Sequence, residues 1–366
     1  MIKQKTAIIV GIYNRNRDGN IREAEAALEE MVLLARTSRL IVSEAFVKTL
    51  ESFNHATLFG EGQVRQIDDL VKKYQANIVI VDHKMSPAQI RNLEKNWECT
   101  VIDRTDLILE IFQQHAGTRE AELQIEMARL QYLLPRLTGQ WTHLDRQYGG
   151  IGIRRGVGET QLEKDRRLVK QEIAHIRSLL KKVEQSRETQ QNRRRNSFRI
   201  ALVGYTNAGK STLLNTLTGS KTYADDKLFA TLDPRTRRWI LPGNIPVLIT
   251  DTIGFIRRLP HHLIASFKSA LIEAHYADLI WHVVDYSHPE QTTQEQIVLE
   301  TLKEIGLQDK PIWTLNNKID RCSIQPGMEK DGVFYISALN KNGFQALIDA
   351  VFFAIAKNNT NSNINQ

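Results

Sequence analysis

The strongest chemical signal in this 366-residue chain is a glycine-rich segment that begins at residue 204. It reads G-Y-T-N-A-G-K-S and fits the pattern G-x-x-x-x-G-K-S/T, after the apolar run 198–203 and before an amphipathic stretch. In this setting backbone N–H groups wrap phosphate oxygens, the lysine neutralises the β- and γ-phosphates, and the serine hydroxyl binds Mg²⁺. The residues assigned to the phosphates are Gly204, Tyr205, Thr206, Asn207, Ala208, Gly209, Lys210, Ser211 and Thr212.

A second motif indicates which base the site accepts. Asn317, Lys318, Ile319 and Asp320 follow the apolar run 312–315. A carboxylate at position 320 can accept hydrogen bonds from the ring N–H and the exocyclic amine of guanine. Adenine offers neither donor there and would leave the buried charge without a partner. After the strand predicted at 333–336, Ser337, Ala338 and Leu339 form a short loop that we expect to support the base. The motif therefore predicts a guanine nucleotide.

A third motif is suited to sensing the γ-phosphate. Asp251, Thr252, Ile253 and Gly254 come directly after the apolar run 247–250. The Asp251 carboxylate is expected to hold Mg²⁺ through water, and the Gly254 N–H to meet the γ-phosphate. Loss of that phosphate would release the segment, as in the order–disorder switch of GTPases.

The loop upstream of that motif is expected to contact the same phosphate, through Phe229, Ala230, Thr231, Leu232 and Asp233. Thr222 and Thr236 lie in the same predicted loop and are alternatives to Thr231 as a metal ligand. Thr231 is favoured because 20 residues separate it from Ser211 and 20 from Asp251. The expected metal ligands are thus Ser211, Thr231 and Asp251, and the expected catalytic residues are Lys210, Thr231 and Gly254.

Alternating strand and helix patterns must position these motifs. They extend over residues 198–357, which predicts an α/β domain with a mostly parallel sheet. Residues 1–116 predict a second, smaller α/β domain, with strands at 6–13, 77–82 and 100–103, and no catalytic constellation is recognisable in it. The polar segment 358–366 is expected to be a disordered tail.

Between these domains, residues 117–197 show a different pattern. Apolar residues recur at alternating spacings of four and three within 118–138 and within 160–195, which is typical of coiled-coil helices. Both stretches are short, so we expect them to pair as an antiparallel helical hairpin. Its tip, 139–159, is rich in glycine and contains Arg146, Tyr148, Arg154 and Arg155. A flexible tip is one interpretation, but interleaved arginines and aromatic residues favour contact with RNA.

Composition and charge place the chain among cytoplasmic globular proteins. Hydrophobic residues make up 42% and charged residues 25%, which excludes wholesale disorder. No apolar run is long enough to span a membrane, no signal peptide is recognisable, and two cysteines indicate a reduced compartment. The net charge is +7, and residues 164–199 hold twelve basic and four acidic residues, a sum of +8. Charge alone leaves open whether this segment faces a polyanion or is merely solvated.

The chain as a whole resembles the HflX family of GTPases. Segment 156–167 (GVGETQLEKDRR) is similar to a signature of that family, and segments 86–94, 101–112 and 130–139 are similar to it as well. The resemblance implies a small α/β domain, a helical hairpin and a P-loop GTPase domain that hydrolyses GTP to GDP with Mg²⁺. It also implies binding to the large (50S) ribosomal subunit and its RNA, and splitting of ribosomes under stress. We expect a monomer. A ribosome-assembly GTPase, or a nucleotide-sensing RNA-binding scaffold with negligible turnover, are the alternatives.

Several positions depart from the family pattern. Val157 stands where proline is usual, Lys164 adds charge, and residues 59–63 read FGEGQ in place of G-K-G-K. The chain ends soon after residue 357, whereas many members carry a further domain. Some members are reported to hydrolyse ATP through the N-terminal region, but the sequence shows no second P-loop.

One further position bears on the rate of hydrolysis. Many relatives have glutamine after the glycine at position 254 to orient the attacking water, but this chain has Phe255. Phenylalanine cannot hydrogen-bond to water, so a low intrinsic rate is expected. Activation by the ribosome is favoured, and K⁺ held by the side-chain carbonyl of Asn207 is the alternative.

Overall fold

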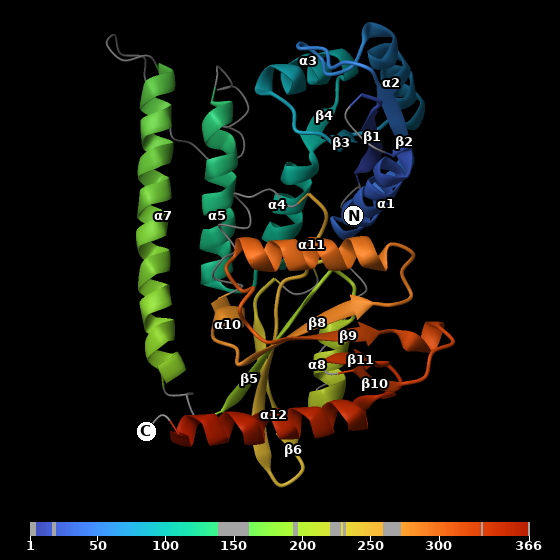
Figure 1. Cartoon of the computed structure of the whole chain (residues 1–366). Coiled ribbons are helices and arrows are strands. Elements are labelled where there is room, and N and C mark those ends of the chain that lie inside the picture. The colour runs from blue at the N-terminus through green and yellow to red at the C-terminus, as the bar shows by residue number, and fades with distance from the viewer. Residues whose placement is uncertain are drawn as a thin grey trace. The chain divides into compact units, whose positions relative to one another are not determined.

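The computed structural model describes residues 5–16, 20–137, 161–192, 197–219, 228–229, 232–258, 272–330 and 332–364. They form two compact units, coloured from blue to red along the chain in Figure 1. The first unit comprises residues 1–114 and 122–182, and the second comprises residues 115–121 and 183–366. The fold class is mixed α/β with mainly parallel sheets, which confirms the prediction.

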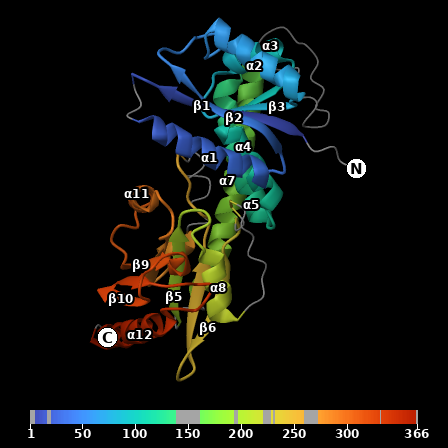
Figure 2. The same cartoon turned by 90° about the vertical axis from the view of Figure 1, so that its right-hand side faces the viewer.

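The first unit contains a four-stranded parallel sheet with the order β2-β1-β3-β4. Its strands are β1 (Thr6–Asn14), β2 (Ile41–Leu50), β3 (Ile78–Val81) and β4 (Thr100–Asp103). Helix α1 (Ile21–Thr37) packs on β1 and β2, while α2 (Glu61–Tyr74) and α3 (Pro87–Trp97) cover the other face (Figure 2). The sequence analysis did not identify β2, because polar side chains interrupt this edge strand.

A pair of helices completes the first unit. After α4 (Arg104–His115), the chain forms α5 (Arg119–Leu133), the short helix η1 (Leu134–Arg136) and, later, α7 (Gln161–Asn192). Helices α5 and α7 run antiparallel, side by side (Figure 1). Their shared core contains Leu123, Met127, Ile173 and Ile176, as the heptad pattern predicts. The predicted tip, with Arg146, Tyr148, Arg154 and Arg155, lies outside the described residues.

The second unit contains a seven-stranded sheet with the order β10-β11-β9-β8-β5-β7-β6. The strands are β5 (Phe198–Gly204), β6 (Arg235–Leu241), β7 (Ile245–Asp251), β8 (Leu279–Asp285), β9 (Ile312–Asn317), β10 (Gly327–Lys330) and β11 (Val333–Tyr335). Edge strands β6 and β10 are antiparallel to their neighbours, and the others are parallel.

Helices cover both faces of this sheet. Helices α8 (Lys210–Thr218) and α12 (Phe344–Ile364) share one apolar core with it, which includes Trp239 and Trp281. The short helix α10 (Ile272–His275) and α11 (Gln291–Glu304) also pack against the strands. Because β7 and β8 flank β5, the strand order reverses at β5, and ligands of such sheets bind at the carboxyl end of that position.

The last described residues of the chain belong to a helix. Helix α12 continues to Ile364, so residues 358–364 are helical and do not form the disordered tail that their polar composition suggested. A helix that is already nucleated by packed residues extends at little further entropic cost, even through polar residues. No helix in the described part of the chain is long and apolar enough to cross a membrane.

Candidate nucleotide-binding site

The glycine-rich loop lies where β5 ends and α8 begins. Gly204 is the last residue of β5, and Lys210 is the first of α8. Gly209 has a φ of +96°, and a Cβ there would lie 2.3 Å from Nδ2 of Asn317. Only glycine satisfies both conditions, so the loop closes tightly over the helix N-terminus, where N–H groups are available for anions.

Lys210 is held inside this loop. Its side chain is buried, and its Nζ donates to the carbonyl oxygens of Gly204 at 3.0 Å and of Tyr205 at 2.8 Å. Burial lowers the pKa of Lys210 to about 8, although the nearby Asp251 carboxylate opposes this shift. The ammonium group therefore has neutral partners that it can exchange for phosphate oxygens.

Two of the three predicted metal ligands lie together. Ser211 Oγ donates to Asp251 Oδ2 at 2.6 Å, and Asp251 is almost fully buried at the carboxyl end of β7. A hydroxyl and a carboxylate oxygen are hard ligands of the kind that Mg²⁺ prefers, so this pair fits that ion. Ala230 and the third predicted ligand, Thr231, lie outside the described residues, as does Thr222.

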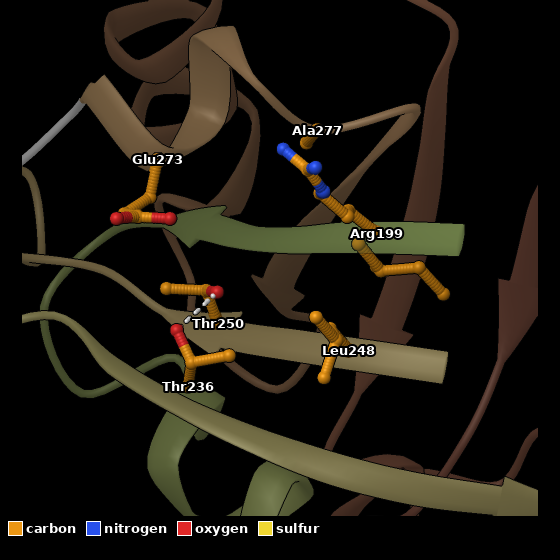
Figure 3. Close-up of a pocket in the computed structure, with 7 residues that line it drawn as sticks. Arg199, Thr236, Leu248, Thr250, Glu273 and Ala277 are labelled. Carbon is orange, nitrogen blue, oxygen red and sulfur yellow. Dashed lines mark hydrogen bonds between the residues drawn. The ribbon is translucent and has the colours of Figure 1, made fainter. Parts of the chain in front are cut away.

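The alternative ligand Thr236 lies in strand β6 and not in a loop. Its hydroxyl shares a hydrogen bond of 2.9 Å with that of Thr250, in the neighbouring strand β7. Figure 3 shows this pair in a small pocket of the sheet, which Arg199, Leu248, Glu273 and Ala277 also line. Thr236 is therefore paired with β7, and its hydroxyl is hydrogen-bonded to Thr250.

The segment around Gly254 packs directly on the glycine-rich loop. A Cβ at Gly254 would lie 2.9 Å from Thr206 Cα and 3.2 Å from Lys210 Nζ. The next residue, Phe255, pairs with the loop through its backbone: its N–H donates to Gly204, and its carbonyl accepts from Thr206. The phenyl ring is 2% exposed, so Phe255 serves as a buried anchor of this segment. Within the same motif, Thr252 donates its hydroxyl to the Leu202 carbonyl, and Ile253 is buried.

Asn317, at the end of β9, connects the phosphate and base segments. Its Nδ2 donates to the carbonyl of Ala208 at 2.9 Å, and its Oδ1 accepts from the Ala338 N–H at 2.9 Å. One side chain therefore bridges the glycine-rich loop and the loop at 337–339. The sequence motif identifies Asn317 but not this bridge, because both partners are distant in the chain.

Two of the predicted base-binding residues are oriented by polar contacts with neighbouring side chains. Ser337 Oγ donates to Asp320 Oδ1 at 2.5 Å, and Lys318 Nζ forms an ion pair of 2.8 Å with Asp285, at the end of β8. Ile319 and Ala338 are buried, whereas the Leu339 side chain is 73% exposed. The Asp320 carboxylate is thus oriented by a hydroxyl that the sequence analysis assigned only to the supporting loop.

Three more residues complete the surroundings. Burial, together with Lys210, lowers the pKa of His282 in β8 to about 4, so the imidazole is neutral. The Tyr205 hydroxyl accepts from the Arg257 N–H at 2.8 Å, which adds a further bond between the glycine-rich loop and the segment after Gly254. The sequence offers no signal for either arrangement.

The residues predicted upstream of β6 are only partly described. Phe229 and Leu232 are buried. Asp233, predicted as a nucleotide contact, directs its carboxylate oxygens to Gly117 and Thr118, at 2.9 Å and 2.5 Å. The exposed residue Asn207 makes no side-chain hydrogen bond within the described part of the chain.

Comparisons with known proteins agree with this geometry. Family models match a GTP-binding GTPase N-terminal region at residues 25–113, a GTP-binding GTPase middle region at 115–194 and a 50S ribosome-binding GTPase at 199–318. The GTPase HflX of Escherichia coli (strain K12) is 46% identical over 301 residues, which cover 80% of this chain and 70% of that protein. The GTPase HflX of Lacrimispora saccharolytica is 44% identical over 336 residues, which cover 90% and 79%. A crystal structure of SsGBP with GDP is 26% identical, covers 97% of this chain and 99% of that chain, and has a TM-score of 0.52.

Proposed function

Because this chain belongs to the HflX family of GTP hydrolases, we propose that it binds the large ribosomal subunit and splits ribosomes under stress, with hydrolysis timing its release. One observation carries the proposal: residues 199–318 match a 50S ribosome-binding GTPase, and they hold a glycine-rich loop that Asn317 ties to the base segment. The protein would act as a monomer in the cytoplasm.

In this proposal each part of the site has one task. Lys210 gives up its carbonyl partners and neutralises the β- and γ-phosphates, while Asp320 reads guanine. Ser211 and Asp251, the latter through water, would hold Mg²⁺ together with Thr231. When bound, this ion supplies positive charge to the phosphate oxygens. The Gly254 N–H meets the γ-phosphate, and water then displaces GDP from phosphorus.

The residue that follows Gly254 does not help to position the attacking water. Phe255 is buried, and its backbone is paired with the glycine-rich loop, so it offers no group to orient the attacking water. We therefore propose that the 50S subunit supplies or orders the missing group. K⁺ at Asn207 is the alternative, since that side chain is exposed. Equal turnover in KCl and NaCl at matched ionic strength would exclude K⁺.

The helical pair would provide the contact with ribosomal RNA. Basic residues lie on the exposed surface of α7, away from the apolar seam; they include Arg167, Lys170, Arg177, Lys181 and Lys182. We propose that the tip residues Arg146, Tyr148, Arg154 and Arg155 extend this contact, which makes 50S binding weaken as salt rises.

The decisive experiment for splitting is a sucrose gradient of 70S ribosomes incubated with the protein and either GTP or GDP. The proposal predicts conversion to subunits with GTP only, and loss of conversion in an Arg154→Ala/Arg155→Ala variant. Binding to 50S without any splitting would favour a ribosome-assembly GTPase. Binding without GTP turnover would favour an RNA-binding scaffold that senses nucleotide.

A further inference from the structure

Several contacts hold the segment after Gly254 against the glycine-rich loop. The Phe255 N–H donates to the Gly204 carbonyl at 3.1 Å, and the Phe255 carbonyl accepts from the Thr206 N–H at 2.8 Å. Tyr205, between those two loop residues, forms an isolated parallel bridge with Phe255. A Cβ at Gly254 would lie 2.9 Å from Thr206 Cα, so the two segments are in close contact. The position of Gly254 therefore depends on how this short segment docks.

Two residues after Phe255, Arg257 is bound through both its backbone and its side chain. Its N–H donates to the Tyr205 hydroxyl at 2.8 Å, and its Nη2 forms an ion pair of 2.7 Å with Glu290 Oε2. Only 10% of the Arg257 side chain and 33% of the Glu290 side chain are exposed. Arginine is rarely buried unless it is paired, so this ion pair fixes the place of the residue. We refer to Tyr205, Arg257 and Glu290 as the Arg257 clamp.

Glu290 attaches the clamp to the start of helix α11. It directly precedes Gln291, the first residue of that helix, and its carbonyl accepts from the Gln294 N–H at 3.0 Å. The Glu290 N–H donates to Nδ1 of His288 at 3.1 Å. Helix α11 in turn packs on strand β8, and its residue Val298 is fully buried. Arg257 is thereby tied to a helix that packs on the sheet, in addition to its bond with the glycine-rich loop.

These contacts bear on the affinity for the γ-phosphate. In the proposed function the Gly254 N–H contacts that phosphate, which GTP carries and GDP lacks. If nothing held the segment after Gly254, its backbone would have to be ordered when GTP binds, at a cost in conformational entropy. Contacts within the protein that hold the segment reduce this cost, which is how preorganisation raises affinity.

We propose that Arg257 is a positioning residue for the γ-phosphate: its ion pair with Glu290 and its bond to Tyr205 hold Gly254 where its N–H meets that phosphate. The inference rests on the proposed function for the contact between Gly254 and the γ-phosphate. Because GDP lacks this phosphate, the clamp contributes to the affinity for GTP and not to the affinity for GDP. The clamp thus raises the preference of the site for GTP over GDP.

Binding measurements on the full chain test the clamp, with Mg²⁺ and either GDP or a non-hydrolysable GTP analogue. Arg257→Met removes the guanidinium and keeps an unbranched side chain. It should weaken binding of the analogue by about tenfold, the cost of ordering the backbone of a single residue, while GDP affinity stays within about twofold of the wild type. Arg257→Lys keeps a positive charge next to Glu290 and should recover most of the affinity for the analogue.

Glu290→Gln tests the partner of Arg257, since glutamine has nearly the same size as glutamate but no charge. It should give the same selective loss as Arg257→Met. The double variant should lose no more than either single variant, because both changes break one interaction. Tyr205→Phe removes the acceptor of the Arg257 N–H and should produce a smaller loss in the same direction.

Two exposed residues of the same unit provide matched controls. Glu300→Gln neutralises an exposed carboxylate on the same helix, α11, and Arg238→Met removes an exposed arginine in β6. Both variants should bind GDP and the analogue as the wild type does.

The outcomes separate the clamp from the proposed function. Equal losses for GDP and the analogue in Arg257→Met, or no loss for either, would overturn the clamp. A selective loss in Arg257→Met that Glu290→Gln does not share would also overturn it, and would indicate that the guanidinium itself contacts the phosphate. A wild type that binds neither nucleotide would overturn the proposed function itself.

Discussion

Both sheets of this protein carry charged residues at the carboxyl ends of their parallel strands, but the partners of those residues differ. In the first unit, Arg104 forms ion pairs with Glu30 and Asp82. Arg136 forms ion pairs with Asp103 and Asp106, and we refer to these six residues as the paired cluster. In the second unit, Lys210 is bonded to backbone carbonyls, and Asp251 accepts from the hydroxyl of Ser211. The carboxylates of the first sheet end are neutralised by arginines, whereas Lys210 and Asp251 at the second have neutral hydrogen-bond partners that a phosphate and a metal can replace.

This difference shows that position at the end of a strand does not by itself make a binding site. Arg136 also donates to the Met85 carbonyl and lies 3.7 Å from the ring centre of Tyr132. These contacts attach η1, at the end of α5, to the sheet. The charges of the first unit therefore hold a helix in place.

The largest expected effect is on the paired cluster. Arg104→Met should lower the free energy of opening of β3 by about 3–5 kcal/mol, because it removes a buried cation that is paired with two buried carboxylates. Hydrogen exchange of residues 78–81 measures this change. The exposed pair of Lys72 with Asp68, 2.7 Å apart, provides the control, since Lys72→Met should change nothing measurable. Wild-type exchange rates for residues 78–81 in Arg104→Met would show that the cluster does not stabilise β3.

The second prediction concerns the base. Asp320→Asn should weaken GTP binding by about a hundredfold, the loss expected for a charge-assisted hydrogen bond of about 2–3 kcal/mol. Because the new amide donates where the carboxylate accepted, the variant should bind xanthosine triphosphate more tightly than GTP. Competition binding with both nucleotides tests this. Unchanged GTP affinity without a xanthine preference would show that another group reads the base.

The third prediction follows from the neutral partners of Lys210. Burial lowers the pKa of Lys210 to about 8 in the free protein, and phosphate binding requires the charged form. Affinity for GTP should therefore be constant below that pKa and fall by about tenfold per pH unit above it. Calorimetric titrations on both sides of the pKa measure the slope. A flat profile would indicate that the lysine stays charged throughout.

The smallest effect is expected in the paired cluster, at Asp106. Burial, followed by the charge of Asp103, raises the pKa of Asp106 from 3.8 to about 6. The folded state then binds the proton more tightly than the unfolded chain, so this stabilisation is complete below about pH 4 and is lost as pH rises through about 6. The Tyr132 hydroxyl donates to Asp106 Oδ2 at 2.7 Å, and Asp106→Asn lacks the titration but keeps an acceptor for this hydroxyl. Thermal unfolding of both proteins across that range should show the wild type losing stability relative to the variant.

Local patterns explain what could be predicted from the sequence. The glycine-rich loop with its flanking strand and helix, and the heptad spacing of α5 and α7, depend on residues close together in the chain. Asn317 illustrates the limit: its motif is local, but its bonds to Ala208 and Ala338 depend on how the strands are ordered. The contact of Asp233 with Thr118 is equally invisible in the sequence, since 115 residues separate the two.

Edge and terminal elements were the least predictable parts of the fold. Strand β2 contains Ser43, Glu44 and Lys48, which a half-buried edge tolerates but which mask an apolar run. The end of α12 is polar, and its helical form follows from the packed residues before it. In both places the tertiary neighbours, and not the local residues, decide the structure.

The most direct test of the central claim is the rate of GTP hydrolysis by the wild type and by Lys210→Ala, each with and without 50S subunits. If the site at the end of β5 carries out the reaction and the ribosome activates it, 50S should raise the wild-type rate by about tenfold or more. Lys210→Ala should remain at background in both conditions. Hydrolysis by Lys210→Ala at the wild-type rate, or a wild-type rate that 50S leaves unchanged, would contradict this claim.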